Sequence, residues 1–291
     1  MAPAILHPSF KKLRYRRIIK EPRTKNQQPK TINLHIMTIL IDIGNSTIVV
    51  AVADSGKTIR HTWRFKTLKE ETSTYFRGEI LSGLNKFHIN ISTLEHIIIS
   101  SVVPEVNDDI TQALADICSI QPHFFRLDDA LRVIDINIES PSQLGKDRLA
   151  DAIGAAATYG TPAIIFDMGT ATTVGVVDDK RGFIGGMIIP GVKTSLRALS
   201  TKASQLPCIT IERPRQFIGR NTLECMQSGI VYGTASMVDG IIDRISANYD
   251  KPVHVVATGG MAKKIIPACS HKVVIDEYLQ FKGLLEVIHN A

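Results

Sequence analysis

The stretch IDIGNSTIVV, residues 41–50, decides the fold, because a cluster of Asp, Gly, Asn, Ser and Thr lies between two runs of β-branched residues. A related stretch, FDMGTATTVGVVDD, begins 125 residues further on, at Phe166. Aligned without a gap over fourteen residues, the two stretches share six identities. The identical pairs are Asp42/Asp167, Gly44/Gly169, Thr47/Thr172, Val49/Val174, Val52/Val177 and Asp54/Asp179. A single hairpin of this kind says little, whereas two predict a duplicated domain.

Apolar periodicity places strands and helices around each copy of the hairpin. The first half predicts strands at 38–42, 47–53, 61–66, 96–103 and 123–127, with helices at 72–87, 107–120 and 144–158. The second half predicts strands at 163–167, 172–178, 183–189, 252–260 and 271–278, with helices after Gly191, across 222–248 and after each of the last two strands. We therefore expect two α/β domains, residues 37–159 and 160–291, divided at the breakers YGTP.

The composition is that of a soluble globular protein, with 44% apolar and 21% charged residues among 291. The net charge of +6 is uneven, because residues 1–36 contain nine Lys or Arg and one acid. The remaining 25 basic and 27 acidic residues leave no positive surplus for binding nucleic acid. We expect residues 1–36 to be a basic, disordered extension, which can also lie upstream of a translation start at Met37. No apolar run approaches the ~20 residues of a membrane span.

The two Asp-x-Gly turns, Asp42–Val49 and Asp167–Thr173, have the composition of phosphate-binding loops. Glycine at positions 44 and 169 lets the backbone approach a ligand closely. Backbone N–H groups and the Ser and Thr hydroxyls can then hold phosphate oxygens. The Asp of each turn can bind a cation such as Mg²⁺, which takes one or two carboxylates and keeps several waters. An ordinary Asp-capped hairpin would explain one copy equally well, but two copies favour nucleotide binding.

Other nucleotide and hydrolase motifs are absent from the sequence. SGKT, residues 55–58, resembles the end of a P-loop, but the leading Gly is replaced by Ala51 and the segment joins two strands. The chain has no GxGxxG and no GxSxG. Its four Cys and nine His show no metal-ligand spacing. The sequence therefore predicts a nucleotide site without a P-loop.

A second candidate for chemistry is GKDRLADAIGAA, residues 145–156. Asp147 and Arg148 lie at the start of an Ala-rich helix, where the helix dipole favours an ionised carboxylate. Asp147 could accept a proton from a substrate hydroxyl, and Arg148 could hold an anion bidentately. From this segment alone, a helix-capping Asp and a surface Arg are the favoured interpretation.

Seven motifs, in order, resemble those of type III pantothenate kinases. They are Asp-x-Gly-Asn-Ser at 42–46, SSVVPEVN at 100–107, Gly-x-Asp-Arg at 145–148, DMGTATT at 167–173, GGMIIPG at 185–191, IGRNTLECMQSGIVYG at 218–233 and TGG at 258–260. The resemblance spans Thr38 to about Leu285. It implies the fold of the acetate/sugar kinase–Hsp70–actin superfamily, with two ribonuclease H-like (actin-like ATPase) domains and a cleft between them.

The resemblance also implies an activity. Members of the family use ATP to phosphorylate the primary hydroxyl of pantothenate to 4'-phosphopantothenate, the first step of coenzyme A biosynthesis. They are cytoplasmic homodimers that need Mg²⁺ with ATP and a monovalent cation, K⁺ or NH₄⁺. The implied partners are ATP, pantothenate and a second copy of the chain, without nucleic acid or membrane.

Carried over by motif, the resemblance assigns roles to individual residues. The ATP-binding residues are Asp42, Ile43, Gly44, Asn45, Ser46, Thr47, Ile48, Val49 and Thr170. Asp147 resembles the general base, and Asp167 resembles the monovalent-cation ligand. The substrate-binding residues are Gly145, Lys146, Asp147, Arg148 and Thr222. Arg148 would meet the carboxylate of pantothenate, and Thr222 would act across the dimer interface.

Two residues depart from the family pattern. Ile138 stands where the family has a Tyr that lines the pantothenate pocket, and Asp151 stands where it has an Asn. The second change replaces an amide by an acceptor-only group. We expect altered substrate affinity with the chemistry intact.

Two alternatives stay open on the sequence. One is a Bvg accessory factor-like transcriptional regulator, which would rest on the basic extension or a partner surface. The intact Asp147 and both phosphate loops count against a purely regulatory role. The other is a kinase or phosphohydrolase of the same superfamily with a different acceptor, which only Ile138 and Asp151 favour.

Overall fold

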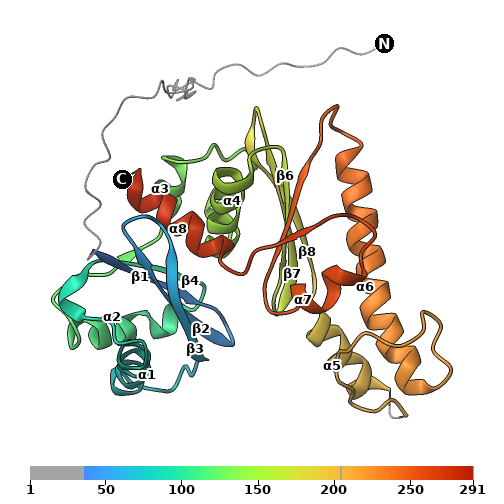
Figure 1. Ribbon diagram of the computed structural model, residues 1–291, viewed down its shortest axis with the longest axis horizontal. Coiled ribbons are helices and arrows are strands. Elements are labelled where there is room, and N and C mark those ends of the chain that lie inside the picture. Colours follow the sequence, from blue (N-terminus) through green and yellow to red (C-terminus); the bar gives the residue numbers. More distant parts are fainter. Residues whose placement is uncertain (1–35, 204, 291) are drawn as a thin grey trace, which may run out of the picture. The chain divides into compact units, whose positions relative to one another are not determined.

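A computed structural model describes residues 36–203 and 205–290. Apart from Ile36, the predicted basic extension lies outside the described residues. The described chain builds two five-stranded mixed sheets with helices packed on them (Figure 1). Within these ranges, no helix is long and apolar enough to cross a membrane.

The first sheet has the strand order β3-β2-β1-β4-β5. Its strands are β1 (Met37–Ile43), β2 (Thr47–Asp54), β3 (Ile59–Lys66), β4 (Leu94–Ser101) and β5 (His123–Phe124). The first three strands are antiparallel, whereas β4 runs parallel to β1 and β5 runs parallel to β4. The crossover helices α1 (Ser73–Lys86) and α2 (Asn107–Ala115) bury Phe76 and Ile110 in a core with Ile41 of β1.

The second sheet repeats this arrangement in the order β8-β7-β6-β9-β10. Its strands are β6 (Ala163–Met168), β7 (Ala171–Asp178), β8 (Gly182–Pro190), β9 (His254–Thr258) and β10 (Val274–Ile275). The same pairs are antiparallel and parallel as in the first sheet. Helices α5 (Val192–Lys202), α6 (Thr222–Ser246) and α7 (Ala262–Ile265) share a core with Phe166 of β6. The predicted duplication is confirmed.

Helices α4 (Lys146–Tyr159) and α8 (Leu279–His289) pack against the other face of both sheets. Leu149 of α4 and Leu284 of α8 share a core with the first sheet, and Ala152 and Leu279 share one with the second. The two helices touch at Gly154 and Gly283, where any added Cβ would overlap backbone of the other helix. This close contact explains the Ala-rich composition of α4. The predicted boundary at 159/160 stays a prediction, because α8 also packs on the first sheet.

The register of the two hairpins corrects the ungapped alignment. In the first hairpin Asp42 lies opposite Val49, and in the second Asp167 lies opposite Thr173. The second turn is therefore one residue shorter, so the alignment holds up to the glycine of each turn and is wrong after it. With one gap, Asp54 becomes equivalent to Asp178, and β2 and β7 have the same burial pattern along their length.

Most predicted elements are confirmed, with two differences at the sheet edges. The strands expected at 123–127 and 271–278 shorten to the two-residue β5 and β10. After β5, the Asp129 carboxylate accepts a hydrogen bond from the Arg126 N–H at 2.8 Å and thereby starts α3 (Leu127–Leu131). The described part of the chain also contains four 3₁₀ turns, at Ile91–Thr93, Pro104–Val106, Pro141–Gln143 and Ile266–Ala268. SGKT lies in the β2–β3 hairpin, as expected.

Candidate active site

The first Asp-x-Gly turn joins β1 to β2 and offers polar groups to solvent. The Gly44 carbonyl accepts a hydrogen bond from Thr67 Oγ1 at 2.6 Å, which fixes the turn. Ile43 and Ile48 are fully buried and pair with each other across the hairpin, so in this structure neither exposes an atom to a ligand. The exposed or half-buried residues of the turn are Asp42, Gly44, Asn45, Ser46, Thr47 and Val49. Of the predicted ATP contacts in this turn, these six are open to a ligand.

The second turn joins β6 to β7 and is held by neighbouring segments. Thr170 is exposed, and its carbonyl accepts a hydrogen bond from Thr194 Oγ1 at 2.8 Å. Gly259, after β9, has φ of +86° and lies so close to Asp167 that a Cβ would overlap the carboxylate. Glycine is required there by both conformation and space. The Thr-Gly-Gly segment thus forms a wall beside Asp167.

Helix α4 brings its first turn to the same region. The Asp147 carboxylate accepts a hydrogen bond from the Arg148 N–H at 2.8 Å through Oδ1. Asp147, like Gly145 and Lys146, is half-buried. Asp151 follows one helical turn later and therefore lies on the same face as Asp147.

Asp42, Asp147, Asp151 and Asp167 form what we call the acidic cluster. Burial raises the pKa of Asp42 to about 7. The hydrogen bond from Gln280 lowers this pKa in part, and the negative charges of Asp147 and Asp167 raise it further. Burial and then the charge of Asp147 raise the pKa of Asp167 to about 7. Burial, followed by the other three carboxylates, raises the pKa of Asp151 well above its usual range. Three carboxyl groups whose pKa values are raised by burial and by neighbouring negative charge favour a bound cation.

One buried oxygen atom of the acidic cluster has no hydrogen-bond partner among the described residues: Asp151 is 4% exposed and its Oδ1 is unpaired. Thr172 Oγ1 is also buried and unpaired, but Thr172 pairs with Met168, whose side chain belongs to the core on the other face of the sheet. Buried polar atoms without partners call for a ligand, an ion or water. Among the described residues, no group of three or more His, Cys, Asp or Glu is arranged to chelate a metal directly. A cation here would take one or two carboxylates and complete its shell with other oxygens.

Arg148 points away from the acidic cluster toward the second sheet. Its Nη2 donates to the Val174 carbonyl at 3.3 Å, and its guanidinium lies 5.7 Å from the centre of the Phe183 ring. Burial lowers its pKa, which the charge of Asp147 partly offsets. Its Nε is buried without a partner, so the guanidinium keeps a donor for an anionic ligand. Ile138 lies beside the neighbouring strand β8, near Gly185.

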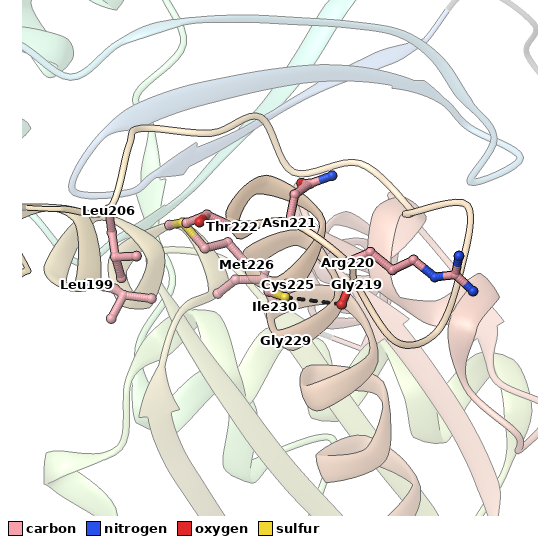
Figure 2. Close-up of a pocket in the computed structure, with 10 residues that line it drawn as sticks. All are labelled: Leu199, Leu206, Gly219, Arg220, Asn221, Thr222, Cys225, Met226, Gly229 and Ile230. Carbon is pink, nitrogen blue, oxygen red and sulfur yellow. Dashed lines mark hydrogen bonds between the residues drawn. The ribbon is translucent and has the colours of Figure 1, made fainter.

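Thr222 lies apart from the other predicted residues. Figure 2 shows it at the first turn of α6, in a pocket of about 720 Å³ whose other wall includes Leu199 and Leu206. Asn221 caps the helix by accepting a hydrogen bond from the Glu224 N–H at 2.9 Å. No residue of the acidic cluster lines this pocket. Within one chain, the structure does not bring Thr222 together with Asp147.

Two residues near the acidic cluster were not predicted. Gln280 of α8 donates from Nε2 to Asp42 Oδ1 at 2.8 Å and to Ser100 Oγ at 3.2 Å. Gln280 belongs to no motif, and only the packing of α8 against β1 brings it to this place. Ser100 lies in the SSVVPEVN motif, which predicted no role for it.

Comparison with known proteins identifies the family. The model of the family described as type III pantothenate kinase matches residues 38–244. The type III pantothenate kinase of Halalkalibacterium halodurans is 36% identical over 249 residues, which cover 85% of this chain and 97% of that protein.

Two solved structures resemble the fold. The activator of 2-hydroxyisocaproyl-CoA dehydratase from Clostridium difficile, with bound ADPNP, has a TM-score of 0.53 at 10% identity and covers 88% of this chain and 96% of its own. A Campylobacter jejuni protein assigned to the Baf family of transcriptional activators has a TM-score of 0.50 at 16% identity, covering 86% of this chain and 97% of its own. At such identities these structures show the fold alone. The sequence relatives and the family model show more: this chain belongs to the type III pantothenate kinase family.

Proposed function

We propose that this chain transfers the γ-phosphoryl group of ATP to the primary hydroxyl of pantothenate, giving 4'-phosphopantothenate, the first step of coenzyme A biosynthesis. Membership of the type III pantothenate kinase family supports the substrates. The observation that carries the chemistry is the acidic cluster beside two Gly-rich turns, because it offers a base and cation ligands next to phosphate-binding groups.

Asp147 is the proposed general base. Its Oδ1 is occupied by the Arg148 N–H, which leaves Oδ2 for the substrate hydroxyl. As the hydroxyl oxygen attacks the γ-phosphorus in line, its proton passes to Asp147, the bond to the β–γ bridging oxygen breaks and ADP leaves. The loose transition state needs positioning more than base strength. Arg148 holds the pantothenate carboxylate through its Nε–H, which has no partner among the described residues.

The two turns hold the nucleotide phosphates in this proposal. N–H groups of residues 45–47, with the exposed hydroxyls of Ser46 and Thr170, face the phosphate oxygens, whereas the Gly44 N–H donates to the Thr47 carbonyl at 3.1 Å. The buried side chains of Ile43 and Ile48 contribute packing only.

The acidic cluster fits bound cations. Asp167 and the unpaired oxygen of Asp151 are the groups we assign to them. Mg²⁺ with ATP and a monovalent cation, K⁺ or NH₄⁺, would supply the positive charge that offsets the phosphates when bound.

The chain would act as a homodimer in which Thr222 serves the active site of its partner. The separation of Thr222 from Asp147 within one chain supports this arrangement. So do the exposed apolar side chains next to Thr222, namely Phe217 at 65%, Ile218 at 76% and Leu223 at 47% exposure. Contiguous exposed apolar residues commonly mark protein–protein interfaces.

The test is ADP release by purified protein with ATP and Mg²⁺, in K⁺, NH₄⁺ or Na⁺ buffer. We expect turnover with pantothenate in K⁺ or NH₄⁺ and little in Na⁺. An analogue that lacks the primary hydroxyl controls for ATP hydrolysis. Bound ATP without any pantothenate turnover would contradict the proposed acceptor.

A further inference from the structure

Gln280 joins the ends of two neighbouring strands of the first sheet. It lies in the first turn of α8 and is half-buried. Its Nε2 donates to Asp42 Oδ1 at 2.8 Å and to Ser100 Oγ at 3.2 Å. Asp42 of β1 and Ser100 of β4 are partners in the parallel register, so a single amide group contacts both strands beside the first phosphate turn. The proposed mechanism gives this contact no role so far.

The contact with Asp42 requires a hydrogen-bond donor at this position of α8. An ionised carboxylate only accepts hydrogen bonds, so the amide must present its nitrogen to Asp42, and a hydrogen bond to an ionised group is stronger than one between neutral groups. The bond occupies Oδ1 of Asp42 and leaves Oδ2 for a ligand. A carboxylate that is held by one oxygen keeps the other oxygen in a defined place, which is how supporting side chains prepare a binding site.

The start of α8 is itself fixed by the second sheet. Asp276, which directly follows β10, is 6% exposed and accepts hydrogen bonds from three donors. The Tyr278 N–H donates to its Oδ1 at 3.0 Å, and Lys282 Nζ donates to its Oδ2 at 2.6 Å. The Tyr159 hydroxyl, at the end of α4, donates to the same Oδ2 at 2.7 Å. Two of these donors flank Gln280 in the chain, so its backbone is held in place on both sides.

We propose that Gln280 is a positioning residue, which holds the Asp42 carboxylate in the orientation that the first phosphate turn uses when it binds ATP. This inference rests on the proposed use of ATP. Gln280 acts through Asp42, and its donor group is the part of the side chain that matters. Because the start of α8 is fixed by the second sheet, the geometry of the first turn depends on the packing of a helix that belongs to neither phosphate turn.

The test is a double-mutant cycle, read by calorimetry of ATP binding with Mg²⁺ and without pantothenate. Gln280→Met keeps the length of the side chain and removes the donor, and Asp42→Ala removes the acceptor. We expect Gln280→Met to weaken ATP binding about tenfold when Asp42 is present and less than twofold in the Asp42→Ala background. A positioning residue has no effect once the group that it positions is gone. Equal losses in the two backgrounds would overturn the proposal.

Two further variants distinguish the donor from packing. Gln280→Glu has the shape of Gln but only accepts hydrogen bonds when ionised, so it should weaken ATP binding at least as much as Gln280→Met. Gln112→Met is the matched control, since the exposed Gln112 of α2 also donates to an Asp, Asp116, at 2.8 Å. It should bind ATP like wild type. Wild-type ATP affinity in Gln280→Met would assign Gln280 to packing and overturn the proposal.

The proposed kinase activity and the role of Gln280 fail in different ways. An effect of Gln280→Met that depends on Asp42, in a protein that does not phosphorylate pantothenate, would keep the positioning role and remove the acceptor. Pantothenate turnover, with equal losses of ATP affinity in both backgrounds, would keep the kinase and remove the positioning role. Absence of any ATP binding by wild type would remove both.

Discussion

At Asp151 a buried carboxyl group lies near four other carboxylates, those of Asp42, Asp147, Asp167 and Asp276, and keeps one oxygen unpaired. An Asn side chain would remove one negative charge, and its amide could donate to a neighbouring carboxylate. We therefore predict that Asp151→Asn raises the free energy of unfolding at pH 8, without nucleotide or added cations, by about 1–3 kcal/mol. Urea denaturation measures the change. Asp128→Asn, at an exposed acid, should stay within about 0.5 kcal/mol of wild type. A less stable Asp151→Asn protein would contradict the electrostatic interpretation.

The sequence predicted those site residues that belong to a recognisable short pattern of neighbouring residues. Asp42 and Asp167 each precede a glycine turn, and Asp147 begins a helix, so each is visible within a few residues. Gln280 was missed because a single Gln in an amphipathic helix is ordinary. Its contact with Asp42 depends on the docking of α8, which no local pattern encodes. The unpaired oxygen of Asp151 is likewise a property of packing.

At the scale of elements, the α4–α8 contact allows no added atom. A Cβ at Gly283 would overlap the carbonyl oxygen of Ala150, which is backbone and cannot rotate away. We predict that Gly283→Ala lowers the free energy of unfolding by about 1–3 kcal/mol and reduces turnover, because α8 also carries Gln280. Gly78→Ala, in an exposed site of α1 with open space around it, should instead gain about 0.5–1 kcal/mol. Thermal and urea unfolding of both variants check this. Equal effects of the two substitutions would contradict the packing argument.

At the end of each duplicated hairpin, the carboxylate of an ionised Asp accepts hydrogen bonds from several donors. The hydrogen bond from the Arg181 side chain lowers the pKa of Asp178 far below its usual range. Burial raises this pKa by a smaller amount, and the backbone N–H groups of Lys180 and Arg181 lower it further. A lowered folded-state pKa adds stability above the unfolded pKa of about 4 that is lost as the pH falls below it. We predict that Asp178→Ala costs about 1–3 kcal/mol at pH 7 and clearly less at pH 3.

Urea denaturation at pH 7 and pH 3 measures this difference. Asp178→Asn is the control, because it keeps an oxygen for the two N–H groups and loses only the charge. It should cost less than Asp178→Ala at pH 7. A cost of Asp178→Ala that is the same at both pH values would contradict the assignment.

The elements were predictable where apolar periodicity is strong, as in β1, β2, α1 and α4. The length of the second turn could not be predicted, because the two hairpins share Asp, Gly and Val residues whether they are aligned with or without a gap. Only the pairing of Asp167 with Thr173 settles that register. The short β5 and β10 are edge strands with a single neighbour, so few contacts extend them beyond two residues.

At the scale of the whole molecule, the proposed dimer makes a prediction that a monomer cannot satisfy. Asp147→Asn and Thr222→Ala each inactivate the protein if the two residues serve one site. When the two variants are unfolded, mixed and refolded together, each mixed dimer regains one intact site, with Asp147 from one subunit and Thr222 from its partner. We predict that turnover reappears in the mixture and in neither variant alone. A mixture as inactive as its components would contradict the shared site.

The duplicated architecture followed from the internal repeat, because two similar hairpins predict two similar sheets. The internal repeat did not predict that α8 returns to the first sheet, or that Thr222 lies far from Asp147. Both features depend on long-range packing. The family resemblance supplied the roles, and the structure adds the contacts that test them.

The most direct test of the account is the formation of phosphopantothenate by wild type and Asp147→Asn, measured by mass spectrometry at saturating ATP. Asn can still accept the Arg148 N–H through Oδ1, so the fold and ATP affinity should be kept. We predict a fall in kcat of ~10²–10⁴, the usual range for loss of a general base. Asp109→Asn, at a helix start where Oδ1 accepts the Ser73 N–H, should turn over like wild type. Near wild-type kcat in Asp147→Asn would contradict the central claim.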